Sequence, residues 1–380
     1  MQQLSAAHQR AVKEGVIIMI VLKENTVVWN LLRIIALCGE FPVYSIGILG
    51  NRREYRKRIA EMQLEQTYKN PYTGQKMTVR ALTIASYGKT KSVRILKNAA
   101  DLLKWIGYYE PYAERFLRKR FPGNEGHLDR NHRVAETAAL FLRAGFSVES
   151  AYNADLKQRE KAVFYLPHVF KRFEDEPGPD PKTQYTRITG AFASPECGYA
   201  VYNTRDRAMV WTGKGELKSM LLLRERFNRD LDGAILLGKD YETGMRAALN
   251  PDSAESVIPF CQMYRKLFFV PLDGNGVDLL QLITKKDVSE RVLEMMFNPA
   301  SRSYQKGTFN YHAMIGGVYV YSFLDSDVRG LNEFRKGMCP ADRNEILCYD
   351  FQADFIKQFF RETGIKITVI PFEAVRNNLK

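Results

Sequence analysis

The sequence predicts an α/β protein with a basic, helix-rich N-terminal module and a larger C-terminal domain. The length of 380 residues suggests roughly two or three domains. Residues 1–150 hold 24 lysines and arginines against 13 acidic residues, whereas residues 151–380 hold 32 and 30. The second half alternates β-branched apolar runs with amphipathic segments, which is typical of an α/β layer. We predict an N-terminal extension (1–24), a basic module (25–148) and an α/β domain (149–380).

The basic module begins with two helical signals. Asn25-Thr26 can cap a helix over residues 27–38, whose apolar side chains recur at helical spacing and which Gly39 ends. Pro42 suits the first turn of a second short helix, which Gly50 stops. The pattern predicts two consecutive helices joined by a tight turn.

A third helix is expected from Asn51, a capping residue, to about Leu64. Tyr55, Ile59 and Met62 fall on one face of this helix at a spacing of three to four residues. The remaining surface is dominated by cations. We therefore expect a thin apolar seam against the core and a cationic outer face.

A basic hairpin follows the third helix. Its arms are predicted at residues 66–68 and 76–84, joined by the turn sequence Asn-Pro-Tyr-Thr-Gly at 70–74. Further helices are expected over residues 90–106 and 129–143. Three helices followed by a hairpin is the order of a winged helix-turn-helix module.

In such a module the third helix enters the major groove of DNA, and the hairpin lies along the backbone or minor groove. Arginine can pair twice with guanine, and both cations neutralise phosphate. Hydroxyl groups at the start of the second helix can bind phosphates. The predicted DNA-binding residues are Tyr44, Ser45, Arg52, Arg53, Arg56, Lys57, Lys69, Tyr72, Lys76 and Arg80. The alternatives are a merely solvated helix face and a protein-docking module.

The segment Asn131-His132-Arg133-Val134-Ala135, which opens the helix ending at Arg143, completes a pattern over residues 27–150. This pattern resembles the replication-relaxation family of plasmids and integrative mobile elements. The resemblance implies a winged helix followed by an α/β domain similar to restriction endonucleases. It also implies an accessory or regulatory role in mobile-element replication or conjugative mobilisation, with a relaxase or replication initiator as partner. We expect His132 to pack or cap its helix rather than to act in catalysis.

The second half begins with elements in the order of a restriction-endonuclease core: strands at 186–193, 199–203 and 208–211, a helix at 216–228 and a strand at 234–237. That chemistry requires an acidic residue and a Glu-x-Lys motif to hold a divalent metal and activate water. Asp206, Glu216 and Lys218 are the candidates, but Asp206 falls in a turn and Glu216 at a helix start. We therefore expect a degenerate endonuclease-like fold without a metal or enzymatic activity. A metal-dependent nuclease using these residues is one alternative, and a transcriptional repressor with a C-terminal sensing or dimerisation domain is another.

The rest of the second half continues the alternation, with no internal repeat visible in the sequence. Helices are predicted at 241–249, 277–297 and 354–363, and strands at 267–271, 318–323, 346–351 and 367–370. The acidic, proline-rich residues 173–183 predict an exposed loop.

Several functional classes lack their signals. The five cysteines and five histidines are scattered, without the clusters that a zinc site or a relaxase metal site needs. We therefore expect no cofactor. The longest apolar run near the start, residues 15–22, is too short to span a bilayer and lacks signal-peptide features. These features predict a cytoplasmic protein.

Overall fold

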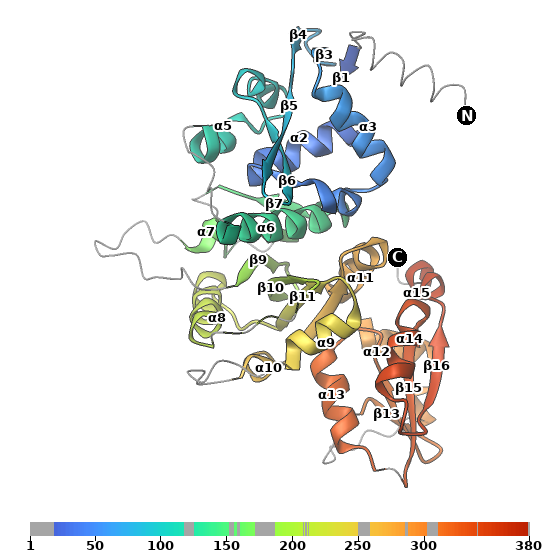
Figure 1. The fold of residues 1–380 in the computed structure, drawn as a ribbon. Coiled ribbons are helices and arrows are strands. Elements are labelled where there is room, and N and C mark those ends of the chain that lie inside the picture. The colour runs from blue at the N-terminus through green and yellow to red at the C-terminus, as the bar shows by residue number, and fades with distance from the viewer. Residues whose placement is uncertain are drawn as a thin grey trace, which may run out of the picture. The chain divides into compact units, whose positions relative to one another are not determined.

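The computed structural model describes residues 19–117, 125–151, 156–157, 160–171, 187–207, 209, 211, 213–249, 259–285, 288–301, 311–339 and 341–378. The chain divides into two compact units, residues 1–143 and 144–380 (Figure 1). This division lies close to the predicted boundary after residue 148. Both units combine helices and strands, so the predicted α/β class is confirmed at this level.

The first unit opens with the predicted helices. Helix α2 (Val27–Cys38) starts where the Thr26 hydroxyl accepts the backbone N–H of Trp29 at 3.3 Å, and it ends at Gly39, whose φ of 82° suits glycine. The second helix is a 3-10 helix, η1 (Val43–Leu49), rather than an α-helix.

Helix α3 (Arg52–Met62) occupies the predicted third position. The Asn51 side chain accepts the N–H groups of Arg53 and Glu54 at 3.0 and 3.3 Å, so it caps the helix as expected. A longer helix, α6 (Glu125–Arg143), closes the unit and packs against α2, η1 and β2 (Phe41–Pro42).

Two three-stranded sheets complete the first unit. The first has the order β1-β3-β4, with β1 at Met19–Val21, β3 at Gln66–Lys69 and β4 at Lys76–Val79. Because β1 pairs in parallel with β3, residues 19–21 belong to the unit rather than to an extension. The second sheet has the order β2-β6-β5, with β5 at Leu82–Tyr87 and β6 at Thr90–Ile95.

The predicted helix over residues 90–106 is wrong in its first part. Residues 90–95 form β6, which pairs with β5 on one side and β2 on the other. Gly88, with φ of 56°, closes the β5–β6 hairpin. The remaining residues of this range form two short turns of helix, η2 (Lys97–Ala99) and α4 (Leu102–Trp105), and α5 (Tyr109–Tyr112) and the π-helical turn η3 (Ala113–Leu117) follow.

The second unit contains two sheets. The larger has the order β12-β11-β10-β9-β8-β7. Its strands are β7 (Ser147–Glu149), β8 (Val163–Tyr165), β9 (Ile188–Ala193), β10 (Gly198–Arg205), β11 (Gly233–Gly238) and β12 (Leu267–Pro271). Its helices are α7 (Pro167–Lys171), α8 (Lys214–Phe227), α9 (Tyr241–Leu249) and α10 (Phe260–Met263).

Helices α11 (Gly274–Ile283) and α12 (Val288–Met296) and the 3-10 turn η5 (Pro299–Ser301) lead to the smaller sheet, of order β13-β14-β15-β16. Its strands are β13 (Ala313–Ile315), β14 (Val318–Ser322), β15 (Arg343–Tyr349) and β16 (Lys366–Ile370). The associated helices are α13 (Val328–Gly337), η6 (Asp350–Gln352), α14 (Ala353–Phe359) and α15 (Phe372–Asn378).

The second unit repeats one topology. In β9–β12, an antiparallel pair of strands is followed by two parallel strands, each reached through helices. The same arrangement recurs in β13–β16. We call these the first and second repeats. The repetition lies in the topology rather than in the sequence, where no repeat is visible.

Two predictions for the second half are corrected. Met209 and Trp211 lie outside any strand, whereas residues 208 and 210 lie outside the described residues. The Trp211 indole instead donates to the Ala247 carbonyl at 2.7 Å and stacks on Phe260 at a centroid distance of 3.6 Å, so this side chain packs in the core without being part of a strand. The predicted helix over 277–297 is two helices, α11 and α12.

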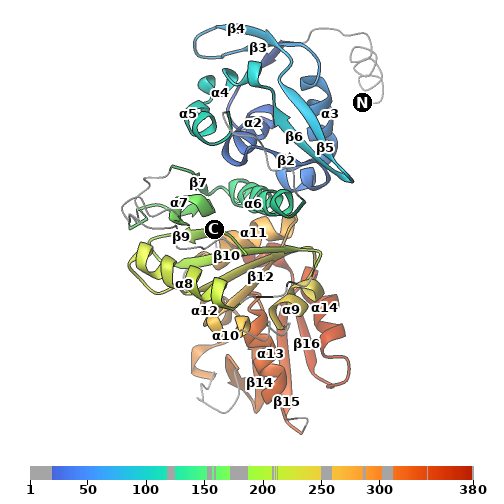
Figure 2. The ribbon, with the colours of Figure 1, turned by 60° about the vertical axis from the view of Figure 1, so that its left-hand side comes forward.

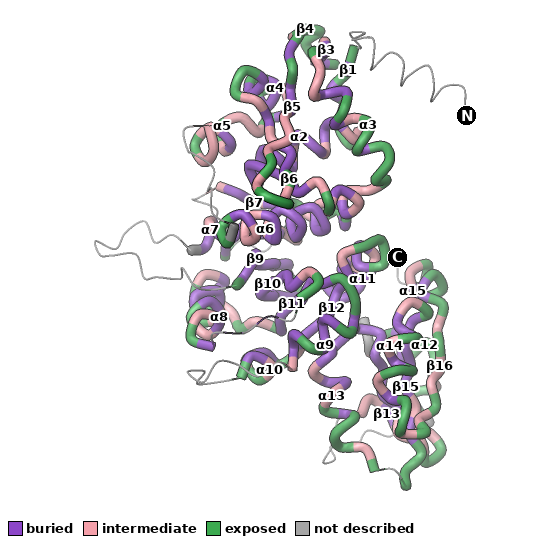
Figure 3. Tube along the Cα trace, viewed as in Figure 1, coloured by how far each residue is buried: buried purple, intermediate pink, exposed green. Residues whose placement is uncertain are grey.

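Burial differs between the sheets. All residues of β11 and β12 are buried, as expected of strands covered on both faces, whereas β16 has no fully buried residue (Figure 3). The predicted loop over 173–183 lies outside the described residues. None of the described helices combines the length and apolarity needed to cross a bilayer.

Gly276 provides a test of the packing between β12 and α11. A Cβ atom there would lie 1.8 Å from the Pro271 carbonyl oxygen, which is backbone. We expect Gly276→Ala to lower the free energy of unfolding by about 1–3 kcal/mol, through overpacking, in a urea titration. The neighbouring Asn275→Ala is the control, because Asn275 is exposed. Equal stability of the two variants would contradict this packing.

Candidate nucleic-acid interface

Helix α3 presents the predicted cationic face. Its buried residues Tyr55, Ile59 and Met62 lie on the side that packs against α2 and η1. Burial raises the pKa of Tyr55, so this phenol stays neutral within the seam. Arg52, Arg53, Arg56 and Lys57 are exposed, with Arg53 and Lys57 on the side opposite the seam and Arg52 and Arg56 beside it.

None of these four cations forms an ion pair in the described part of the chain. The neighbouring Arg58 differs, because its guanidinium lies 2.8 Å from the buried carboxylate of Glu61. The helix therefore separates one structural arginine from four cations that face solvent. Such a face can neutralise phosphates and reach base edges.

The β3–β4 hairpin concentrates further cations. Lys69 and Lys76 occupy directly opposite positions on the two strands, an arrangement that costs stability when no anion lies between like charges. At the tip, the side-chain Oδ1 of Asn70 accepts the backbone N–H of Tyr72 at 2.9 Å, and Tyr72 is 71% exposed. Arg80, after β4, is also exposed. This hairpin end suits a polyanion.

The two residues predicted on the second helix behave differently. Tyr44 is about half exposed, at 49%, with its ring 6.2 Å from that of His132. The Ser45 hydroxyl instead donates to a carboxylate oxygen of Glu136 at 2.5 Å. The Ser45 proton is therefore engaged within the unit, which weakens the prediction that this residue donates to phosphate.

The sequence reasoning missed the β5–β6 hairpin as a basic element. Lys89 at its tip and Lys91 on β6 are both exposed. The tips of the β3–β4 and β5–β6 hairpins lie at opposite ends of the first unit (Figure 1 and Figure 2). The available signal was the turn Tyr87-Gly88-Lys89, which a helical interpretation of residues 90–106 concealed.

A buried polar cluster connects α6 to the β2-β6-β5 sheet. The Arg94 Nε and Nη2 atoms donate to one oxygen of the fully buried Glu40 at 2.9 and 2.7 Å. The His132 Nε2 atom lies 2.6 Å from the Ser92 hydroxyl and 3.9 Å from the other Glu40 oxygen. His132 is 1% exposed, so it packs within the core as the sequence predicted.

The nuclease candidates do not converge. Asp206 lies in an exposed turn after β10, beside Arg207. Glu216 is buried in the first turn of α8, where it accepts the N–H of Arg187 at 3.3 Å. Lys218 is exposed on the same helix, and residues two apart do not share a helix face. The described residues also bring no three potential metal ligands together.

Comparison with known proteins identifies no relative: no protein-family model, curated protein or solved structure matches the chain.

The Glu40–Arg94 pair yields a stability prediction. Glu40→Gln removes the charge that compensates Arg94, whose side chain is only 12% exposed. We expect a loss of about 3–5 kcal/mol in the free energy of unfolding, measured by urea titration. The exposed Asp101–Lys104 pair provides the control, because Asp101→Asn should change stability by less than about 1 kcal/mol. Similar effects of the two variants would refute a structural role for the buried pair.

Proposed function

We propose that the first unit binds double-stranded DNA through a winged helix, with α3 as the helix that enters the major groove. The observation that carries the proposal is the set of four exposed cations on α3, two of which, Arg53 and Lys57, lie opposite a buried apolar seam. An outward cationic surface on a helix fixed by its other side is what major-groove recognition requires.

Strand pairing supports the same proposal. A short strand after the first helix pairs with the second strand of a later hairpin, which gives the order β2-β6-β5. We infer that the β5–β6 hairpin is the wing, with Lys89 and Lys91 near phosphates. The β3–β4 hairpin, which lies between α3 and this wing in the sequence, is then an additional arm that carries Lys69, Tyr72 and Lys76 toward the DNA backbone.

We further propose that the protein acts as an accessory or regulatory factor in mobile-element replication or mobilisation. This part rests on the resemblance of residues 27–150 to the replication-relaxation family. A relaxase or replication initiator is the expected protein partner. No arrangement of Asp206, Glu216 and Lys218 favours the nuclease alternative.

The DNA-binding proposal predicts that Arg53→Ala, Arg56→Ala and Lys57→Ala combined will weaken binding and its salt dependence. Each lost phosphate contact should reduce the slope of log K against log[salt] by about 0.9. Fluorescence anisotropy with duplexes tiled across the host element, over a salt series, measures both quantities. The bound tile also distinguishes an origin, a transfer site and the gene's own promoter.

The matched control removes three exposed cations of the second unit, Lys336, Arg343 and Arg361, which carry no ion pair in the described part of the chain. This variant changes the net charge by the same amount as the α3 triple variant. Equal weakening by both variants would show that only overall charge matters. Unchanged DNA binding by the α3 variant would refute α3 as the helix that recognises DNA.

A further inference from the structure

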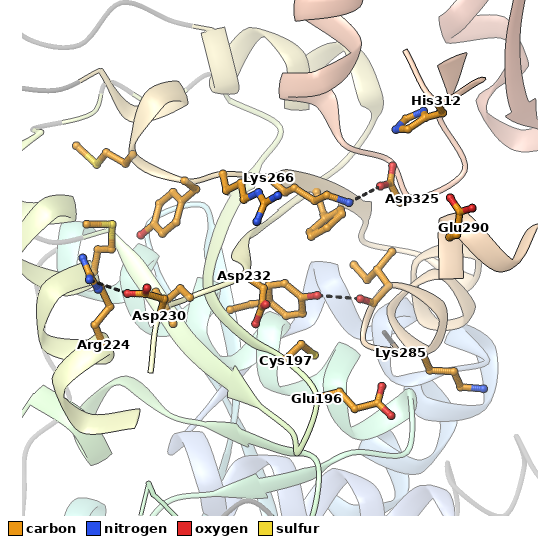
Figure 4. A pocket seen from close by; sticks show the side chains of 18 of the residues that line it. Glu196, Cys197, Arg224, Asp230, Asp232, Lys266, Lys285, Glu290, His312 and Asp325 are labelled. Carbon is orange, nitrogen blue, oxygen red and sulfur yellow. Dashed lines mark hydrogen bonds and ion pairs between the residues drawn. The ribbon is translucent and has the colours of Figure 1, made fainter. Parts of the chain in front are cut away.

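The second unit contains a cavity of about 760 Å³ with an unusual charge pattern. It lies beside the starts of β10, β11 and β12 and extends to the turn after β14. Its volume lies in the range of small-molecule sites. In Figure 4, Asp325, His312 and Glu290 gather on one side of the cavity, whereas Arg224 and Asp230 lie on another.

A strained turn holds Asp325 at the cavity wall. Ser326 has a φ of 61°, rare for a residue other than glycine, and is fully buried. Its hydroxyl lies 2.8 Å from the Tyr241 hydroxyl and accepts from Gln352 Nε2 at 2.7 Å. Such strain persists only where surrounding contacts enforce it, and it is concentrated at functional sites. The turn fixes the Asp325 carboxylate at 5% residue exposure.

A cation lies next to Asp325 in the cavity wall. The Lys266 ammonium lies 3.3 Å from Asp325 Oδ2, longer than an optimal charged hydrogen bond, and its side chain is 44% exposed. Asp325 raises the pKa of Lys266, so the ammonium stays charged. Lys266 and Asp325 thus form an ion pair with each other, and the cation and the anion of this pair both border the cavity.

His312 adds a neutral donor to this group. Its Nδ1 accepts the N–H of Ser322 at 2.9 Å, which places the ring hydrogen on Nε2. Burial lowers the pKa of His312, so the imidazole remains neutral near pH 7. The cavity wall therefore offers a fixed carboxylate, an ammonium and an imidazole N–H.

We propose that this cavity binds a small zwitterion of the amino-acid type. The ligand ammonium would face Asp325, and its carboxylate would face Lys266 and the His312 Nε2–H. A simple anion would meet the buried Asp325 carboxylate, and a simple cation would meet Lys266. Apolar side chains of the lining, including Met220, Leu231 and Leu293, would contact the ligand's side chain.

A nucleotide fits this lining less well. The Lys266 ammonium covers the Phe268 ring at 5.6 Å, and the Tyr199 and Tyr264 hydroxyls are held by the Ile283 carbonyl and the Tyr202 hydroxyl. These aromatic residues are buried, so none presents a free face on which a base could stack. This inference concerns the second unit and does not depend on DNA binding by the first.

The test uses the full chain and the twenty standard amino acids, each at millimolar concentration, in thermal-shift and calorimetric titrations. At least one amino acid should raise the unfolding midpoint, because a ligand that binds the native state stabilises it. Its 2-hydroxy acid and its methyl ester, which lack the ammonium and the carboxylate respectively, should not. Adenosine monophosphate is the comparator for a nucleotide.

Lys266→Met and Asp325→Asn should each weaken the binding of this amino acid by roughly 30-fold or more, because each variant leaves one ligand charge unpaired. Lys336→Met, an exposed change on α13 outside the lining, is the matched control and should bind as the unchanged chain does. If Asp325→Asn fails to fold, Lys266→Met alone decides. Binding of no amino acid, equal binding of the hydroxy acid or ester, preference for the nucleotide, or undiminished binding by Lys266→Met would overturn the proposal.

Discussion

The burial of three side chains on α3 determines what the first unit can offer to a partner. Tyr55, Ile59 and Met62 occupy a narrow strip on an eleven-residue helix. Because side chains three and four residues apart share a face, this strip orients the rest of the helix outward. Four cations consequently gather on one exposed surface, and only Arg58 turns back to the buried Glu61. The proposed DNA contact therefore follows from an apolar constraint rather than from charge alone.

Local signals made α2 and α3 predictable. Thr26, Gly39 and Asn51 act on backbone groups within a few residues, so their effects are visible in sequence. Strand β6 was harder to predict, since only its hairpin with β5 is local and its pairing with β2 joins positions about fifty residues apart. The apolar residues of 90–106 match a helix when those partners are unknown. The cations proposed to bind DNA, from Arg52 to Arg80, could be predicted from the local sequence pattern alone. The hydrogen bond from Ser45 to Glu136 could be seen only in the folded structure.

The second unit shows a different limit of prediction from the sequence. Most of its strands were predicted because wholly buried strands appear as continuous apolar runs. The repeated topology was hidden, since the two repeats share strand order and direction rather than residue identity. The cavity was also hidden, because its lining extends from Glu196 to Asp325 and depends on how loops from both repeats meet. Trp211 illustrates the converse, since an apolar run can serve a loop as well as a strand.

The outermost parallel strands of the two repeats, β12 and β16, differ in whether their outer edges are hydrogen-bonded. The outer edge of β12 is occupied, because the Phe269 N–H donates to the Ser326 carbonyl and the Leu267 N–H to Asp327. In the described part of the chain β16 pairs with β15 alone, and Val369 is 42% exposed. An open strand of β-branched residues is prone to self-association, and a lysine on it opposes such pairing. Lys366 is the one charge within β16 and pairs with Glu345 of β15 at 3.0 Å, so we expect it to oppose the pairing of a second chain with this edge.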